Sequence, residues 1–139
     1  MLPAAPDLDH LTAAISHATA PAFMLGAVAG FLSVLVSRME RIHDRIRTLR
    51  ANAVEGVPDE TAAALSRRFA FLNRAIYFAV LSGLCTAALL IVAFACALLG
   101  ISHTTGVALM FIVALILLMS SLVELTREVR MSLRTMHLD

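Results

Sequence analysis

Residues 75–123 read AIYFAVLSGLCTAALLIVAFACALLGISHTTGVALMFIVALILLMSSLV, a stretch that contains no Asp, Glu, Lys or Arg. A single helix of these 49 residues would be roughly 74 Å long, about twice the thickness of the hydrocarbon core of a bilayer. The stretch must therefore fold back once. Gly100 and Gly106 bracket a small polar cluster, which is typical of a turn. We predict transmembrane helices over 75–99 and 106–123.

The rest of the composition also favours lipid as the solvent. Hydrophobic residues make up 60% of the 139 residues, and the mean hydropathy is +0.86. A soluble domain is usually about half apolar. Residues 18–37 form a further apolar run, close to the ~20 residues that a spanning helix needs. The sequence therefore predicts an all-α integral membrane protein with three transmembrane helices in one domain.

The arginines predict the orientation of these helices. The chain has 11 basic residues and every one is arginine: eight lie in 38–74 and three in 124–139. The N-terminal segment and the turn at 100–106 have none. Because positively charged loops stay in the cytoplasm, we expect the N-terminus outside and the C-terminus inside. The net charge of only +1 argues against a nucleic-acid partner.

The segment before the first span has helical spacing of apolar residues, at Leu8, Leu11 and Ile15. We predict a short amphipathic helix over 7–17 that lies on the outer membrane surface and bends into the bilayer at Pro21. The alternative is a tail without fixed structure.

The segments that flank the spans on the arginine-rich side are charged, but their apolar residues recur at helical spacing and form a stripe, or seam, along one face. Met39, Ile42, Ile46 and Leu49 repeat at spacings of three, four and three, as in a coiled coil. Gly56 and Pro58 then mark a turn. We predict a cytoplasmic helical hairpin over 38–74 and a cytoplasmic helical tail over 124–139, which together form a helical bundle. The pattern does not distinguish a bundle within one chain from a coiled coil between subunits.

Gly26 and Gly30 form a GxxxG motif in the first span, and Ala22, Ser33 and Ser37 extend the stripe of small residues. Small residues at this spacing allow another backbone to approach closely. We therefore predict a helix contact at Gly26 and Gly30, with a partner either in the same chain or in a second copy.

Two pairs of acidic residues stand four positions apart, Glu40 with Asp44 and Glu124 with Glu128. Like charges at this spacing repel one another on a helix, so we expect compensation by arginines from the neighbouring helix, namely Arg67, Arg68 and Arg74. Arg41 with Asp44 and Arg127 with Glu124 can also pair within one helix. The predicted cytoplasmic charge network comprises Arg38, Glu40, Arg41, Asp44, Arg45, Arg74, Glu124 and Glu128.

A metal site is the alternative interpretation of these acids. Glu40 and His43 have the Glu-x-x-His spacing of di-iron helical bundles, but such a site needs two of these motifs and two further Glu. We therefore predict no metal. No motif predicts catalytic residues or a cofactor, so we do not expect an enzyme.

Arg38, Arg41 and Arg45 form a stripe beside the seam of the first helix. Contact with anionic lipid is one interpretation. A ring of arginines around an oligomer axis, which would favour anions, is the second, and contact with another protein is the third.

The chain resembles a bacterial three-span membrane family catalogued as domain of unknown function 2721. The resemblance covers about 15–136, and its specific part is the run Arg38-Met-Glu-Arg41-Ile-His-Asp44-Arg45-Ile-Arg47. It implies a small multi-pass protein of the bacterial inner membrane and implies no activity.

From these observations we expect a homo-oligomeric membrane protein in contact with lipid. The first hypothesis for its role is a non-enzymatic scaffold or accessory subunit that binds an unidentified protein partner. The alternative is an oligomeric ion channel that favours anions through its cytoplasmic arginines. Ser82, Thr86, Ser120 and Ser121 are the few polar residues available to line such a pore.

Overall fold

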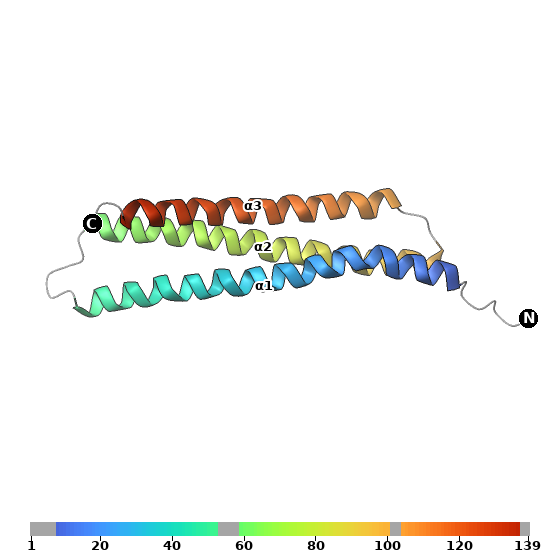
Figure 1. Ribbon diagram of the computed structural model, residues 1–139, viewed down its shortest axis with the longest axis horizontal. Helices are drawn as coiled ribbons and strands as arrows, with labels where there is room; N and C mark the ends of the chain where they lie inside the picture. Colours follow the sequence, from blue (N-terminus) through green and yellow to red (C-terminus); the bar gives the residue numbers. More distant parts are fainter. Residues whose placement is uncertain (1–7, 53–58, 101–103, 137–139) are drawn as a thin grey trace, which may run out of the picture.

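The computed structural model describes residues 8–52, 59–100 and 104–136. It consists of three long helices, α1 (Leu8–Asn52), α2 (Asp59–Leu99) and α3 (Thr104–Met136). They lie side by side along most of their length, with the two chain ends at opposite ends of the molecule (Figure 1). The prediction of an all-helical chain with three long apolar helices is confirmed.

The uncharged stretch folds back where the sequence predicts a turn. Helix α2 ends at Leu99, and Gly100 follows with a φ of 67°. Left-handed backbone of this kind commonly ends a helix, and glycine adopts it without the steric cost that a Cβ would bring. The rest of the turn, at 101–103, lies outside the described residues.

Helix α1 differs from the prediction at its N-terminal end. The sequence predicted a separate surface helix over 7–17 and a bend at Pro21, but α1 is one helix from Leu8 to Asn52 with Pro21 inside it. Proline removes one backbone hydrogen bond from a helix, and membrane helices tolerate this loss where neighbouring groups or small backbone adjustments satisfy the freed carbonyl. Pro21 is buried, so its ring packs against the other helices. The segment predicted as a separate surface helix therefore forms the first part of α1.

Helix α2 is the central helix and contacts both neighbours extensively, whereas α1 and α3 contact each other less (Figure 1). Its buried face explains this position. Six of its residues are at most 1% exposed and recur at alternating spacings of three and four: Leu72, Ala75, Ala79, Ser82, Thr86 and Leu89. Four of the six are small, which lets helix backbones approach closely.

Two clusters of buried side chains join the helices. Leu35 of α1 packs with Leu72, Ala75 and Ala79 of α2, and Met39 and Ile42 pack against this cluster. Met24 and Val28 of α1 form the second cluster with Ala114 of α3. Met39 and Ile42, the first two residues of the apolar seam predicted for 38–74, therefore pack against helices of the same chain.

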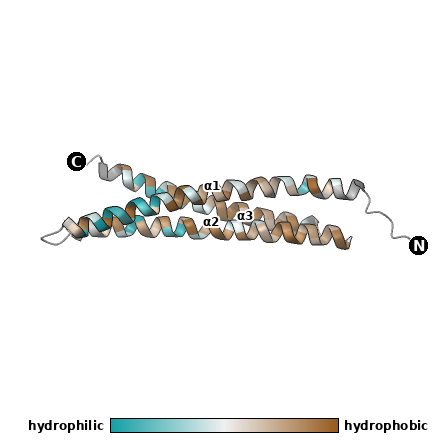
Figure 2. Cartoon of the chain, turned by 90° about the horizontal axis from the view of Figure 1, so that it is seen from below, coloured by the Kyte–Doolittle hydropathy of each residue, from teal (hydrophilic) through white to brown (hydrophobic). Residues whose placement is uncertain are grey.

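The outer surface of the helices is apolar. Phe23 is 78% exposed and Leu98 is 89% exposed. Hydrophilic residues gather at the end of the molecule where the C-terminus lies, and hydrophobic residues dominate the remainder (Figure 2). Each helix contains a segment long and apolar enough to cross a membrane. Exposure of such surface is favourable when the solvent is lipid.

Candidate functional site

The most buried charged group in the described part of the chain is Glu128 of α3, which is 3% exposed. Its two carboxylate oxygens contact arginines from two different helices. Arg38 of α1 donates a hydrogen bond from Nη1 to Oε2 at 3.0 Å. Arg68 of α2 places Nη2 3.5 Å from Oε1. Glu128 therefore links all three helices.

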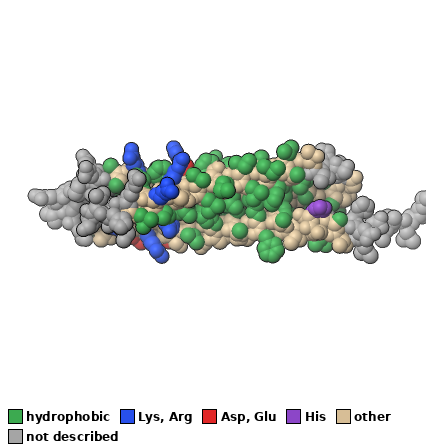
Figure 3. All heavy atoms as spheres, turned by 45° about the horizontal axis from the view of Figure 1, so that its top comes forward, with side chains coloured by type: hydrophobic (Ala, Val, Ile, Leu, Met, Phe, Trp, Pro, Cys, Tyr) green, Lys and Arg blue, Asp and Glu red, His purple; other side chains and the backbone are tan. Residues whose placement is uncertain are grey.

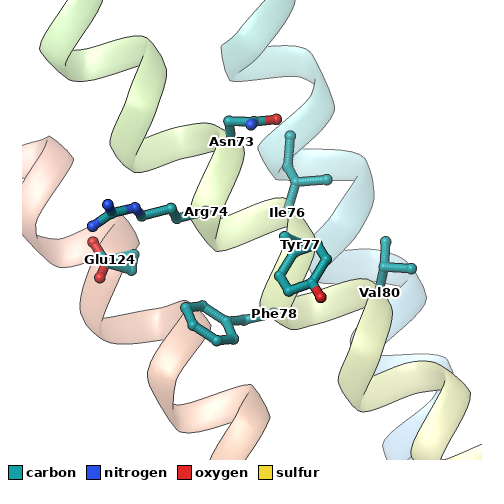
Figure 4. Close-up of a pocket in the computed structure, with 7 residues that line it drawn as sticks. All are labelled: Asn73, Arg74, Ile76, Tyr77, Phe78, Val80 and Glu124. Atoms are coloured by element: carbon teal, nitrogen blue, oxygen red, sulfur yellow. The ribbon is translucent and has the colours of Figure 1, made fainter.

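The second buried acid is Glu124, one helical turn earlier and 9% exposed. Its Oε1 lies 3.5 Å from Nη1 of Arg127 on the same helix, whereas its Oε2 is buried without a hydrogen-bond partner. Arg74 of α2 points toward Glu124, and both residues line a pocket of about 510 Å³ (Figure 4). Glu124 is therefore less completely compensated than Glu128.

Helix periodicity explains why α3 buries both acids. Ala114, Ser121, Glu124 and Glu128 are all buried and are separated by seven, three and four residues, which places them on one helix face. The inner face of α3 thus changes from apolar to polar to acidic toward its C-terminal end. The arginines gather over the same end of the molecule (Figure 3).

The remaining members of the predicted charge network are on the outside. Glu40, Arg41, Asp44 and Arg45 are exposed and form no ion pair with another described residue. The structure brings Arg38 and Glu128 together, directs Arg74 toward Glu124, and leaves the acidic pair of α1 in solvent. Arg68, one of the compensating arginines expected on the neighbouring helix, does pair with Glu128, and its spacing of four from Leu72 places it near the buried face of α2.

Gly26 and Gly30 do not make the predicted close contact within the chain. A Cβ atom built on either glycine would meet nothing within 4 Å. The glycine at which two helices approach closely is Gly83 of α2, where a Cβ would lie 3.3 Å from Cγ1 of Val28. The sequence contained a signal for this contact, because Gly83 lies between two small polar residues, Ser82 and Thr86, in the uncharged stretch. Both of these residues are buried in the structure.

Two serine hydroxyls form hydrogen bonds between helices within the apolar segments. Ser82 donates a hydrogen bond to the carbonyl oxygen of Ala114 at 2.8 Å, and Ser121 donates one to the carbonyl oxygen of Ala75 at 2.5 Å. Both serines are fully buried. Ser120, in contrast, donates only to Ile116 of its own helix.

We expect Ser82→Ala to destabilise the protein because the carbonyl oxygen of Ala114 loses a donor from another helix. Hydrogen bonds of this kind contribute about 0.6 kcal/mol and at most about 1.7 kcal/mol in membrane proteins. Ser120→Ala is the matched control and should change the free energy of unfolding by less. The comparison can be made by thermal unfolding of the two variants in the same detergent. Equal melting temperatures would contradict the interhelical role of Ser82.

In the described part of the chain no three His, Cys, Asp or Glu residues are placed to hold a metal ion. His43, which the metal alternative used, lies beside Phe69 of α2 with ring centroids 6.1 Å apart.

These features define the class of the protein: a multi-pass membrane protein with three apolar helices and a buried charge cluster where the apolar surface ends. Residues 18–138 match the family described as protein of unknown function (DUF2721), and the chain belongs to this family. The resemblance noted from the sequence is thus confirmed. No curated protein and no solved structure matches the chain.

Proposed function

We propose that this chain is a non-enzymatic, homo-oligomeric protein of the bacterial inner membrane that serves as a scaffold or accessory subunit. The observation that supports this proposal is the outward orientation of the small-residue stripe on α1. Ala22, Gly26, Gly30, Ser33 and Ser37 are all exposed. Such a stripe fits the backbone of another helix, and in the described part of the chain no atom lies within 4 Å of a Cβ built on either glycine.

The geometry of α1 explains why the stripe faces outward. Val28 is buried against the other helices, and Gly26 and Gly30 are each two positions from it. Two positions correspond to roughly 200° around a helix of 3.6 residues per turn. The face that contacts α2 and α3 and the face that carries the glycines are therefore opposite, so one helix can serve both contacts at once.

The channel alternative has weaker support. Of its four candidate pore residues, Ser82, Thr86 and Ser121 are buried in the helix packing of one chain. The hydroxyls of Ser82 and Ser121 donate to carbonyl oxygens of neighbouring helices, and that of Thr86 donates to Ser82 of its own helix. A pore would have to be lined by other residues at an interface between copies.

Self-association is the property that the proposal requires first. We expect the full chain in lipid nanodiscs to have a mass of two or more copies by mass photometry, at a lipid-to-protein ratio where chance co-insertion is rare. A matched sample of a monomeric three-helix membrane protein serves as the control. A single-copy mass would overturn both the scaffold and the channel proposals.

The proposed orientation is N-terminus outside and C-terminus in the cytoplasm, supported by the position of every arginine. Thr105 and Ala51 lie at opposite ends of the helices and are exposed. In a background with Cys85→Ala and Cys96→Ala, Thr105→Cys should react with an impermeant maleimide in intact spheroplasts. Ala51→Cys should react only after permeabilisation. The reverse pattern would contradict the orientation.

A further inference from the structure

A pocket of about 270 Å³ opens beside Glu128, between the three helices. Its charged lining consists of Arg38, Arg41 and Arg45 from α1, Arg68 from α2 and Glu128 from α3. Four positive groups and one negative group give a formal charge of +3 (4 − 1). The pocket is smaller than the about 300–1,000 Å³ of sites that enclose drug-sized ligands. Its size and charge therefore favour a small anionic group.

The donors of this pocket are only partly used. Glu128 contacts one terminal nitrogen of Arg38 and one of Arg68. Nε of Arg68 is buried and has no hydrogen-bond partner, which is an unfavourable state for an N–H group of a cation. Arg41 and Arg45 form no ion pair with any described residue. Glu128 thus holds two guanidinium groups in place while the others remain available.

Guanidinium groups recognise phosphate particularly well. Their N–H donors form a planar fork that matches two oxygens of a phosphate, and the hydrogen bonds are strengthened by charge. Ser132 adds a hydroxyl to the lining. A phosphate in the pocket would supply acceptors for arginines on α1 and α2 and would neutralise much of the excess charge.

The depth of the pocket indicates where that phosphate comes from. Arg38 directly follows the apolar run 18–37, and Arg68 lies seven residues before Ala75, or about 10 Å along a helix. The headgroup layer extends about 5–8 Å beyond the hydrocarbon core on each side. Arginine side chains are long enough to reach back toward the membrane. The arginines of the pocket are therefore within reach of the lipid headgroups.

We propose that this pocket binds a phosphate group, with the headgroup of an anionic phospholipid as its source. The site is built by three helices, so it differs from the general attraction of surface arginines to a charged membrane. It does not depend on self-association, because every residue that lines it belongs to one chain.

The test compares two double variants of the full chain in detergent. Arg41→Gln with Arg45→Gln removes two pocket arginines that do not touch Glu128, so the ion pairs that hold the helices stay intact. Arg47→Gln with Arg50→Gln is the matched control, because both residues are exposed on α1 and outside the pocket. Binding of phosphatidylglycerol and of phosphatidylcholine is titrated by native mass spectrometry.

We expect the wild type to retain phosphatidylglycerol more tightly than phosphatidylcholine. The pocket variant should weaken phosphatidylglycerol binding at least about tenfold and the control less than about threefold, since one bidentate contact is stronger than screened surface attraction. Equal losses in the two variants, or no preference for the anionic lipid, would overturn the proposal.

A second arm separates the two sources of phosphate. Thermal unfolding is measured with millimolar inorganic phosphate and with chloride at the same ionic strength. Stabilisation of the wild type by phosphate but not chloride, lost in the pocket variant and without any preference for phosphatidylglycerol, would assign the site to a free anion and overturn the lipid source. Preferential phosphatidylglycerol binding that millimolar phosphate does not displace supports the headgroup, whereas its displacement by millimolar phosphate would overturn the lipid source.

Discussion

Replacing Gly26 and Gly30 together with isoleucine should convert the proposed oligomer to single chains while the three helices stay folded. The two glycines are exposed, and a Cβ at either position would meet nothing within 4 Å. Side chains that start at these positions therefore leave the contacts between the described helices intact. In a contact between small-residue stripes they would force two backbones apart, and close backbone packing is the main source of helix association in lipid.

The measurement is the mass of the variant in nanodiscs together with its melting temperature. Ala108→Ile is one control, because it adds a bulky side chain to an exposed position of α3. Gly83→Ile is the other, because its side chain would collide with Val28 and should lower the melting temperature. A Gly26/Gly30 variant that keeps the wild-type mass would show that another face makes the contact.

Replacing Glu128 with glutamine should cause the largest loss of stability of any single change in the charge cluster. Glu128 is 3% exposed and contacts both Arg38 and Arg68. The side chain of Arg68 is only 17% exposed, so its charge would be left largely buried without a partner. Breaking a buried pair in this way costs up to about 3–5 kcal/mol.

Glu40→Gln is the matched control, since Glu40 is exposed on α1 and pairs with no described residue. Removal of an exposed charge changes the free energy of unfolding by less than about 1 kcal/mol. Glu124→Gln should fall between the two, because one oxygen of Glu124 has no partner to lose. The three melting temperatures in one detergent decide the order. Equal values for Glu128→Gln and Glu40→Gln would contradict the ion-pair role.

A double variant distinguishes a lost ion pair from a local packing defect. Glu128→Leu with Arg68→Met removes both charges and keeps apolar volume, and such replacements are often neutral or stabilising. We expect it to melt above Glu128→Leu alone. If the double variant melts below both single variants, the cluster stabilises the chain by packing and not by charge compensation.

Some of the site was predictable from local patterns. The spacing of four between Glu124 and Glu128 placed both acids on one face of α3, and arginines on neighbouring helices were the expected partners. The sequence did not predict that α1 supplies Arg38 to Glu128 while its own acids, Glu40 and Asp44, stay exposed. That distribution depends on how far α1 is rotated about its axis.

Local patterns were enough to predict three long apolar helices and a turn at Gly100 in the uncharged stretch, because hydropathy and turn chemistry are properties of short segments. The contact of Gly83 with Val28, the outward orientation of Gly26 and Gly30, and the pairing of Glu128 with Arg38 and Arg68 are visible only in the packed helices. These contacts depend on the rotation and the axial register of each helix against the others. Rotation and register result from the packing of side chains on all three helices at once. A pattern within one short segment does not contain this information.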